Sequence, residues 1–435
     1  MPQTTALDDD DLPLVVGAAV TPAQPTPAQL AQQIDAAFAA VPLSPPSTSP
    51  LYVVALVIVG ALALALPFLY LALGVSLAAS GVALVVLLLP QSFGWISGSL
   101  VLGAGLGLVL AGLALLAPVF RRRKHVREPA IVVTRAGEPV LFHLVDRCAR
   151  ALGVATPDEV LLTGEANAAV IEDDDKRVAL VLGLPLVAVL SVRELAGVVA
   201  HELGHVRQGW GRRFLVFVIT SHGWFRGAIE DLESEADAAD ERVSLPEAAM
   251  SLTRAVALVV GLRLLALCLR LSDALITALA TEMELDADRV EAHVAGAEAF
   301  ASASEKICAA AVVLGETRLR ARLGARELPD NLARWAAIRV GAMPRSERRR
   351  AARRITRDAA GVPHPPHEAR VANAQRTNAT GLPLPDAQGS ALFRSFDAYA
   401  TRATRDALFD VMRSGARFVP AESLVTLGGD RYTLR

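Results

Sequence analysis

Apolar residues near the start of the chain form two long blocks without a charged side chain. Residues 51–90 and 98–120 contain no Asp, Glu, Lys or Arg. Each block is longer than the roughly 20 apolar residues with which an α-helix crosses a bilayer. Pro67 and two glycines, Gly74 and Gly81, could divide the first block into two crossings. We therefore expect two or three transmembrane helices in this part of the chain.

From residue 128 onwards the pattern becomes that of a globular domain. Helical spacing of apolar positions predicts a helix over 138–152, and β-prone runs predict strands over 159–163, 168–171 and 177–182. The last two strands flank a charged segment and are expected to pair as a hairpin. These elements predict an α+β fold, mainly helical with a small β-sheet.

A further helix is predicted to begin at Ser191. Ser191 and Glu194 have the spacing of a capping box, an apolar stripe at helical spacing follows, and Gly209 offers an end. Gly204 lies inside this helix, where glycine costs roughly 1 kcal/mol relative to alanine. We therefore expect another element to approach closely at Gly204.

Residues 252–279 are apolar but include Arg254, Arg263 and Arg270. An arginine that faces lipid near the middle of a bilayer is costly. We therefore expect a helix that packs on the protein or lies partly in the membrane interface, with a further transmembrane span as the alternative.

The patterns divide the chain into four parts. The first part is rich in Pro, Ala and Thr without a long periodic pattern, so it is predicted to be mostly disordered. The last part carries no motif that indicates a role. The parts are a disordered segment (1–50), transmembrane helices (51–120), a domain that includes the apolar helix 252–280 (121–372) and a C-terminal tail (373–435).

Composition supports a membrane protein and excludes some partners. Hydrophobic residues make up 53% of the chain, and charged residues only 20%, which is more apolar than a typical soluble protein. The net charge of −2 argues against a nucleic-acid partner. The three cysteines are far apart and indicate neither a disulfide framework nor a cysteine-rich metal site.

A basic run over 121–127 directly follows the second apolar block. By the positive-inside rule, this end of the helix and the domain after it are expected on the cytoplasmic side. A phosphate-binding patch is the alternative use of such a run.

The candidate chemistry lies in the helix that begins at Ser191, where residues 201–205 read His-Glu-x-x-His. Residues four apart share a helix face, so His201 and His205 can bind one Zn²⁺ ion. The ion would activate a water molecule, and Glu202 beside it would take the proton. The motif therefore indicates a zinc-dependent hydrolase of peptide bonds.

A third protein ligand is needed, because a catalytic zinc normally has three ligands and a water. Two Glu-x-x-Ala-Asp segments, 233–237 and 284–288, could supply it. The first lies in an acidic stretch typical of a solvated surface. In the second, Asp288 shares a helix face with Glu284 and could accept the free N–H of a ligand histidine. Spacing alone leaves both open.

Residues 51 to about 372 resemble the membrane-embedded HtpX-like and CAAX-prenyl-protease-type zinc endopeptidases, which are gluzincins with a zincin-like domain after transmembrane helices. The resemblance implies that His201, His205 and Glu284 bind one zinc ion per chain and that Glu202 is the catalytic base. The matching motifs are Arg127-Glu128-Pro129, Asn167-Ala168, residues 182–186, residues 194–205, residues 284–289 with Ala295-Gly296, and residues 364–370.

The same motifs contain groups that could contact substrate. His364, His367 and Arg370 are candidate donors to the oxyanion of the transition state, and Asn167 is a candidate substrate contact. The alternative for Arg370 is a structural salt bridge, which is the more common role of a loop arginine.

The sequence thus predicts a membrane-bound zinc metalloendopeptidase whose active site is on the cytoplasmic side, in a bacterial inner membrane. Its expected partners are a protein or peptide substrate, aligned along the hairpin 168–182, and the lipid bilayer, with no nucleic acid. The alternative is a catalytically silent metal-binding membrane scaffold or sensor. No feature indicates the oligomeric state.

Overall fold

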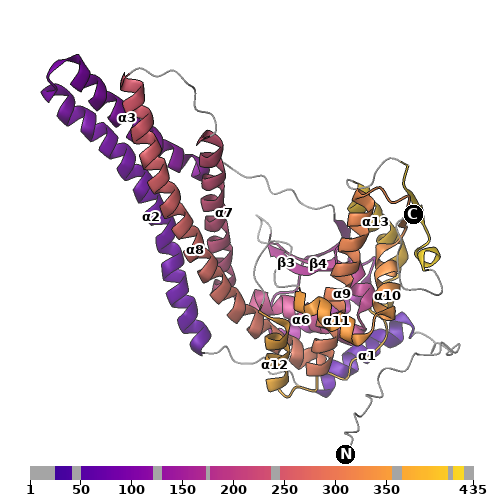
Figure 1. The fold of residues 1–435 in the computed structure, drawn as a ribbon. Coiled ribbons are helices and arrows are strands. Elements are labelled where there is room, and N and C mark those ends of the chain that lie inside the picture. The colour runs from indigo at the N-terminus through magenta and orange to yellow at the C-terminus, as the bar shows by residue number, and fades with distance from the viewer. Residues whose placement is uncertain are drawn as a thin grey trace, which may run out of the picture.

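The protein is a helical bundle joined to a mainly helical domain with a small sheet, as predicted (Figure 1). The bundle contains α2 (Pro50–Leu88), α3 (Gly94–Phe120), α7 (Trp210–Ala236) and α8 (Leu245–Ala295). This computed structural model describes residues 25–41, 50–120, 130–172, 177–236, 245–354, 365–409 and 415–425. The basic run 121–127 and the Arg127-Glu128-Pro129 motif lie outside these ranges.

Two helices, not three, come from the uncharged blocks. α2 continues through Pro67 as one helix and ends in a short 3-10 helix, η2 (Leu89–Gln91). The glycines of α2 serve packing, because a Cβ on Gly81 would lie 2.4 Å from the carbonyl oxygen of Gly105 in α3. Leu56–Gln91 and Gly94–Leu116 are each long and apolar enough to cross a membrane.

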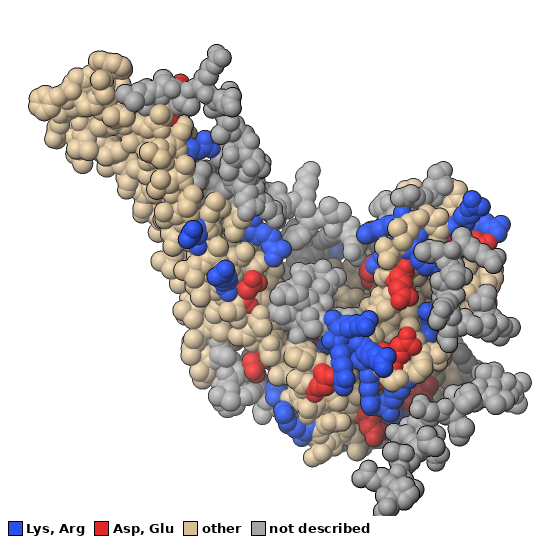
Figure 2. All heavy atoms as spheres, viewed as in Figure 1, with Lys and Arg blue, Asp and Glu red and all other residues tan. Residues whose placement is uncertain are grey.

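A third candidate span lies in α8, over Glu247–Ala295. Only 12% of its most apolar 18-residue stretch is buried within the protein. This low burial favours a further membrane span over a helix that is covered by protein. Figure 2 shows that the end of the bundle farthest from the domain presents almost no charged side chain on this face, whereas isolated charges appear nearer the domain. On this face the far part of the bundle is therefore almost entirely apolar.

The sheet contains β1 (Ile131–Val133), β2 (Glu159–Thr163), β3 (Ala168–Glu172) and β4 (Val178–Gly183) in the order β1-β2-β4-β3. β2 and β4 are parallel, and β3 and β4 form the predicted antiparallel pair. β3 is therefore the outermost strand on its side of the sheet. The expected strands and the helix over 138–152, observed as α4 (Pro139–Leu152), are confirmed.

The helices of the domain share one hydrophobic core with the C-terminal region. Leu382, Leu384, Leu392 and Leu408 are all buried in it, so the core does not end near residue 372. The remaining elements are α5 (Leu184–Val189), α6 (Val192–Arg207), α9 (Ala297–Arg322), β5 (Glu327–Pro329), α10 (Leu332–Ala342), α11 (Arg345–Arg354), α12 (His367–Arg376), η3 (Gly389–Leu392), α13 (Phe396–Phe409), β6 (Arg417–Val419) and η4 (Ala421–Leu424).

The prediction that the first 50 residues are disordered is wrong for residues 27–40. They form α1 (Pro27–Ala40), which begins with a capping box at Thr26. Leu30, Ile34 and Ala37 are spaced along one helix face and are buried in the domain core. In an Ala-rich sequence, a stripe with so few large apolar residues is a weak indication of a helix. The burial of these residues in the domain core nevertheless holds the helix in place.

α6 and α8 pack closely, but not at the glycine we expected. A Cβ on Gly204 would lie 3.6 Å from Ala287, which is an ordinary contact distance. A Cβ on Gly197 would instead lie 2.7 Å from the Cβ of Ala295 and 3.1 Å from the Cγ of Glu291. The close approach of the two helices is therefore at Gly197.

These distances predict opposite effects of two alanine substitutions in one helix. Gly197→Ala should destabilise the protein by about 1–3 kcal/mol, because the added methyl group overpacks the α6–α8 contact. Gly204→Ala, the matched control, should be neutral or stabilising by up to about 1 kcal/mol through helix propensity. Thermal unfolding in detergent measures both, and equal melting temperatures for the two variants would contradict the close contact.

Candidate metal centre

The two histidines lie on the inner face of α6. Its first turn is fixed by the predicted capping box, in which Ser191 and Glu194 bond to each other's backbone N–H groups. Gly209, with φ of +52°, follows the last turn. The rings of His201 and His205 have centroids 4.9 Å apart and are nearly perpendicular. Their side chains are only 9% and 19% exposed.

Glu284 reaches both rings from α8. Its Oε2 lies 3.6 Å from Nε2 of His201, and its Oε1 lies 3.5 Å from Nε2 of His205. Ligand atoms 2.0–2.1 Å from a tetrahedral zinc ion lie about 3.3 Å from one another. The two imidazole nitrogens and the carboxylate therefore fit a zinc ion with a small adjustment. The rival Glu233 belongs to α7, and its side chain is outside the part of the structure that is described.

Two buried carboxylates stand behind His201. Its Nδ1 lies 3.4 Å from Oδ1 of Asp288 and 3.3 Å from Oε2 of Glu291. Asp288 was expected at this place from its spacing to Glu284. Glu291 was missed, although its position seven residues after Glu284 puts it on the same face of α8.

Gln208 makes the corresponding contact to His205. Its Oε1 lies 3.0 Å from Nδ1 of His205, and its Nε2 donates to the carbonyl of Met283 in α8 at 2.7 Å. An acceptor at Nδ1 places the proton there and leaves Nε2 available for a metal. Sequence reasoning missed Gln208 as well. The available signal was its position three residues after His205, on the same side of the helix.

The carboxylates make the centre favourable for positive charge. Burial lowers the pKa of His201, but the carboxylates of Asp288, Glu284 and Glu291 within 3.6 Å of its ring outweigh burial and hold the pKa well above its usual range. Burial also lowers the pKa of His205, whereas the nearby carboxylates of Glu284 and Glu202 raise it overall. The metal-free centre therefore holds protons that a divalent cation would displace.

Arg370 belongs to this cluster as a partner of Asp288. Its Nε lies 3.0 Å from Oδ2 and its Nη2 lies 2.5 Å from Oδ1 of Asp288, and Nη2 is 3.4 Å from Oε2 of Glu284. Burial opposes the charge of the guanidinium, but Asp288 and Glu284 raise its pKa above the usual value. These contacts favour the structural salt bridge over an oxyanion donor.

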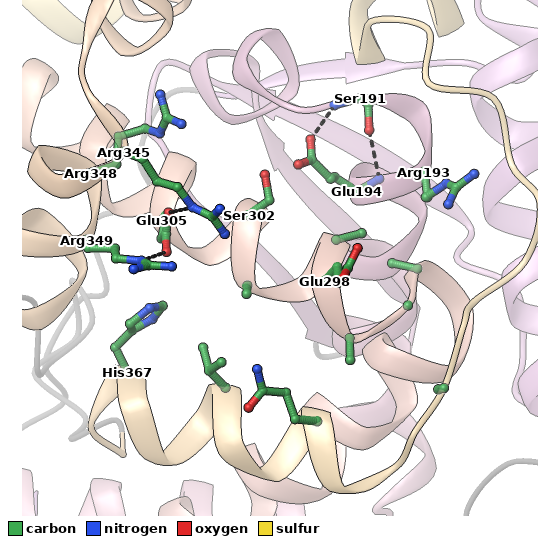
Figure 3. Close-up of a pocket in the computed structure, with 18 of the residues that line it drawn as sticks. Ser191, Arg193, Glu194, Glu298, Ser302, Glu305, Arg345, Arg348, Arg349 and His367 are labelled. Carbon is green, nitrogen blue, oxygen red and sulfur yellow. Dashed lines mark hydrogen bonds and ion pairs between the residues drawn. The ribbon is translucent and has the colours of Figure 1, made fainter. Parts of the chain in front are cut away.

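The other candidate substrate contacts do not join the cluster. Nδ1 of His367 lies 3.1 Å from Oγ of Ser304, and its ring lines a separate cavity of about 1270 Å³ with Arg349 and Glu305 (Figure 3). Burial lowers the pKa of His367. Asn167 is exposed just before β3, and its carbonyl accepts from Gly183 at 2.8 Å. His364 lies outside the described residues.

A comparison with protein families gives one match. A family model described as peptidase family M48 matches residues 137–378, which is more than half of the 435 residues. The matched segment contains both histidines, Glu202 and Glu284, whereas α2 and α3 precede it. No curated protein and no solved structure matches the chain.

The geometry predicts that Glu284 is needed for metal binding and Glu233 is not. Glu284→Ala should remove most of the bound zinc, because it deletes the carboxylate whose two oxygens lie 3.6 and 3.5 Å from the two Nε2 atoms. Glu233→Ala, the matched control, should retain one zinc ion per chain. Elemental analysis of the purified proteins measures both, and zinc loss only in the Glu233 variant would reverse the assignment.

The raised histidine pKa values predict a strong pH dependence of metal binding. As pH falls from about 8 to 6, zinc affinity should fall by up to about tenfold per pH unit for each histidine that becomes protonated. The metal-free protein should behave oppositely, because groups whose pKa is raised by folding stabilise it at low pH and lose that effect as pH rises. Melting temperatures with zinc and with a chelator measure both trends. A zinc affinity that did not change between about pH 8 and pH 6 would exclude the histidines as ligands.

Proposed function

Because the chain belongs to peptidase family M48, a family of zinc metallopeptidases, we propose that it is a membrane-bound, zinc-dependent endopeptidase. This membership agrees with the resemblance to HtpX-like and CAAX-prenyl-protease-type enzymes. The observation that carries the proposal is the convergence of His201, His205 and Glu284 on one point beside Glu202. Three helices long and apolar enough to cross a membrane support the membrane-bound form.

His201, His205 and Glu284 would hold the zinc ion, with Asp288 and Gln208 fixing the two rings from behind. When bound, zinc supplies Lewis-acid polarisation of the scissile carbonyl. Two neutral imidazoles and one carboxylate are the ligand set of gluzincin-type centres, and they leave a position open for substrate.

Glu202 is the proposed general base. It follows His201 on α6, and its charge acts on His205, so its carboxylate belongs to the same site without being needed as a ligand. Its carboxylate would accept a proton from the attacking water and later donate that proton to the amine of the leaving peptide. Arg370 contributes through Asp288 and not by touching the substrate.

β3 is the proposed place where a peptide substrate aligns. It is the outermost strand of the sheet and packs beside α6, the helix that carries the histidines. An extended peptide can add to such an edge through backbone hydrogen bonds. Asn167, exposed immediately before β3, would contact the peptide near one end of this strand.

The metal centre is proposed to lie close to the inner membrane surface. Glu284 lies in the last quarter of α8, after its most apolar part, and Leu279 and Met283 pack against Val59 near the start of the α2 span. With the basic run 121–127 on the cytoplasmic side, the reaction would occur at the cytoplasmic face of a bacterial inner membrane. Proteins or peptides held at that surface are the proposed substrates.

Replacement of Glu202 tests catalysis separately from metal binding. Glu202→Gln should lower cleavage of casein or of a detergent-solubilised membrane protein by about 10²–10⁴-fold, because the amide cannot accept the proton. The variant should keep its zinc, and a chelator should abolish cleavage by the unchanged protein.

Glu347→Gln on the exposed side of α11 is the matched control and should cleave normally. A silent scaffold would bind zinc and cleave none of these substrates at any level sensitive to chelation. Cleavage by Glu202→Gln at the unchanged rate would remove Glu202 from the mechanism.

A further inference from the structure

We propose that Glu291 is a positioning residue for the metal centre, a second carboxylate that holds His201 in the orientation needed to bind zinc. This inference rests on the proposed function, because it concerns the same ion. It assigns a role to a side chain beyond the ligands, the base and Asp288.

Helix geometry brings Glu291 to this place. Glu284, Asp288 and Glu291 follow one another at four and three residues along α8, so they form one stripe that faces α6. The Glu291 side chain is 7% exposed. Gly197 of α6 lies directly against it, since a Cβ there would be 3.1 Å from the Cγ of Glu291. The close helix contact therefore directs this carboxylate towards His201.

Asp288 divides its negative charge between His201 and Arg370. Both oxygens of Asp288 already accept hydrogen bonds from Arg370, at 2.5 to 3.2 Å. Glu291 differs, because His201 is the only Lys, Arg or His side chain within 4 Å of its carboxylate among the described residues. Its Oε2 is also slightly nearer to Nδ1, at 3.3 Å against 3.4 Å.

Two carboxylate oxygens within 3.4 Å of Nδ1 have a chemical consequence for zinc. Nε2 can bind a metal only when the proton of the neutral ring is on Nδ1, and an acceptor fixes both that tautomer and the ring plane. Glu291 and Asp288 lie one helical turn apart on α8 and both carboxylates are within 3.4 Å of Nδ1, so their negative charge favours the proton on Nδ1 and leaves Nε2 for a metal.

The charges around the centre also support a role for Glu291 in metal binding. Three carboxylates on α8 face the centre, whereas Arg370 is the one guanidinium that contacts them among the described residues. Buried carboxylates are costly unless positive charge balances them. A bound divalent ion supplies that balance, so Glu291 increases the preference of the centre for a metal ion.

The test compares zinc affinity across variants of Glu291. Glu291→Leu and Glu291→Ala should each weaken zinc binding by about 10–100-fold in competition with a chelator, as is typical when a partner behind a metal ligand is lost. Glu291→Gln keeps an acceptor oxygen, so its affinity should lie between those of the apolar variants and the unchanged protein. Two apolar variants of different size keep the test valid if one of them fails to fold.

Substitution with Co²⁺ gives a readout that general destabilisation would not change. The visible absorption bands of the Co²⁺ protein should shift in Glu291→Ala, because the His201 ring is no longer fixed, and return most of the way in Glu291→Gln. Glu305→Gln is the matched control: Glu305 is buried and bonded to Arg349 in the cavity beside His367, and it makes no ion pair with His201 or His205 among the described residues, so this variant should keep the zinc affinity and the spectrum.

Glu291→Ala with unchanged zinc affinity and an unchanged Co²⁺ spectrum would overturn the inference. That result would leave the proposed function intact, because zinc would still bind and Glu202→Gln would still be inactive. If the unchanged protein bound no zinc at all, the proposed function would fail first and the role of Glu291 with it.

Discussion

The close packing of α6 against α8 is the contact on which the functional part of this protein depends. α6 supplies two imidazoles and α8 supplies an acidic stripe, and neither helix alone offers a complete ligand set. Gly197 permits the approach at one end of the contact, and Gln208 bonds to the backbone of α8 at the other. The relative position of the helices is therefore fixed on both sides of the histidines.

The α6–α8 contact buries several carboxylates, and cationic side chains from other helices pair with them. Asp288 is paired with Arg370 from α12, and Glu194 at the start of α6 is paired with Lys306 from α9. The C-terminal region also contributes, because Val192 donates to the carbonyl of Ala387. Segments far apart in the sequence thus hold the ends of α6 and the acidic stripe of α8 in place.

The sequence predicts correctly those elements that have a strong local pattern of residues. The capping box of α6, the hairpin of β3 and β4 and the proximity of Glu284 to both histidines all followed from spacing or from family motifs. It failed where tertiary packing decides. α1 is held by apolar contacts with the domain core and by ion pairs of Asp35 with α4, and Pro67 is accommodated within α2. Glu291 and Gln208 are ordinary polar residues until two helices bring them to the histidines.

The direction of a side chain was also beyond the reach of sequence. His367 and Arg370 are three residues apart in one motif, but Arg370 bonds to Asp288 and His367 to Ser304 beside a different cavity. A motif gives the residue types that are available, whereas their contacts depend on which neighbouring helix each one meets.

α8 is one continuous helix, so the metal centre connects the domain directly to the helix of the candidate membrane span. Two ligands come from a helix of the domain, and the third comes from the helix that continues into the candidate membrane span. An ion bound by all three is a crosslink between the domain and its membrane anchor. Zinc would therefore add a third link to the two that Gly197 and Gln208 already provide between α6 and α8, so its removal should loosen the part of this contact around the histidines.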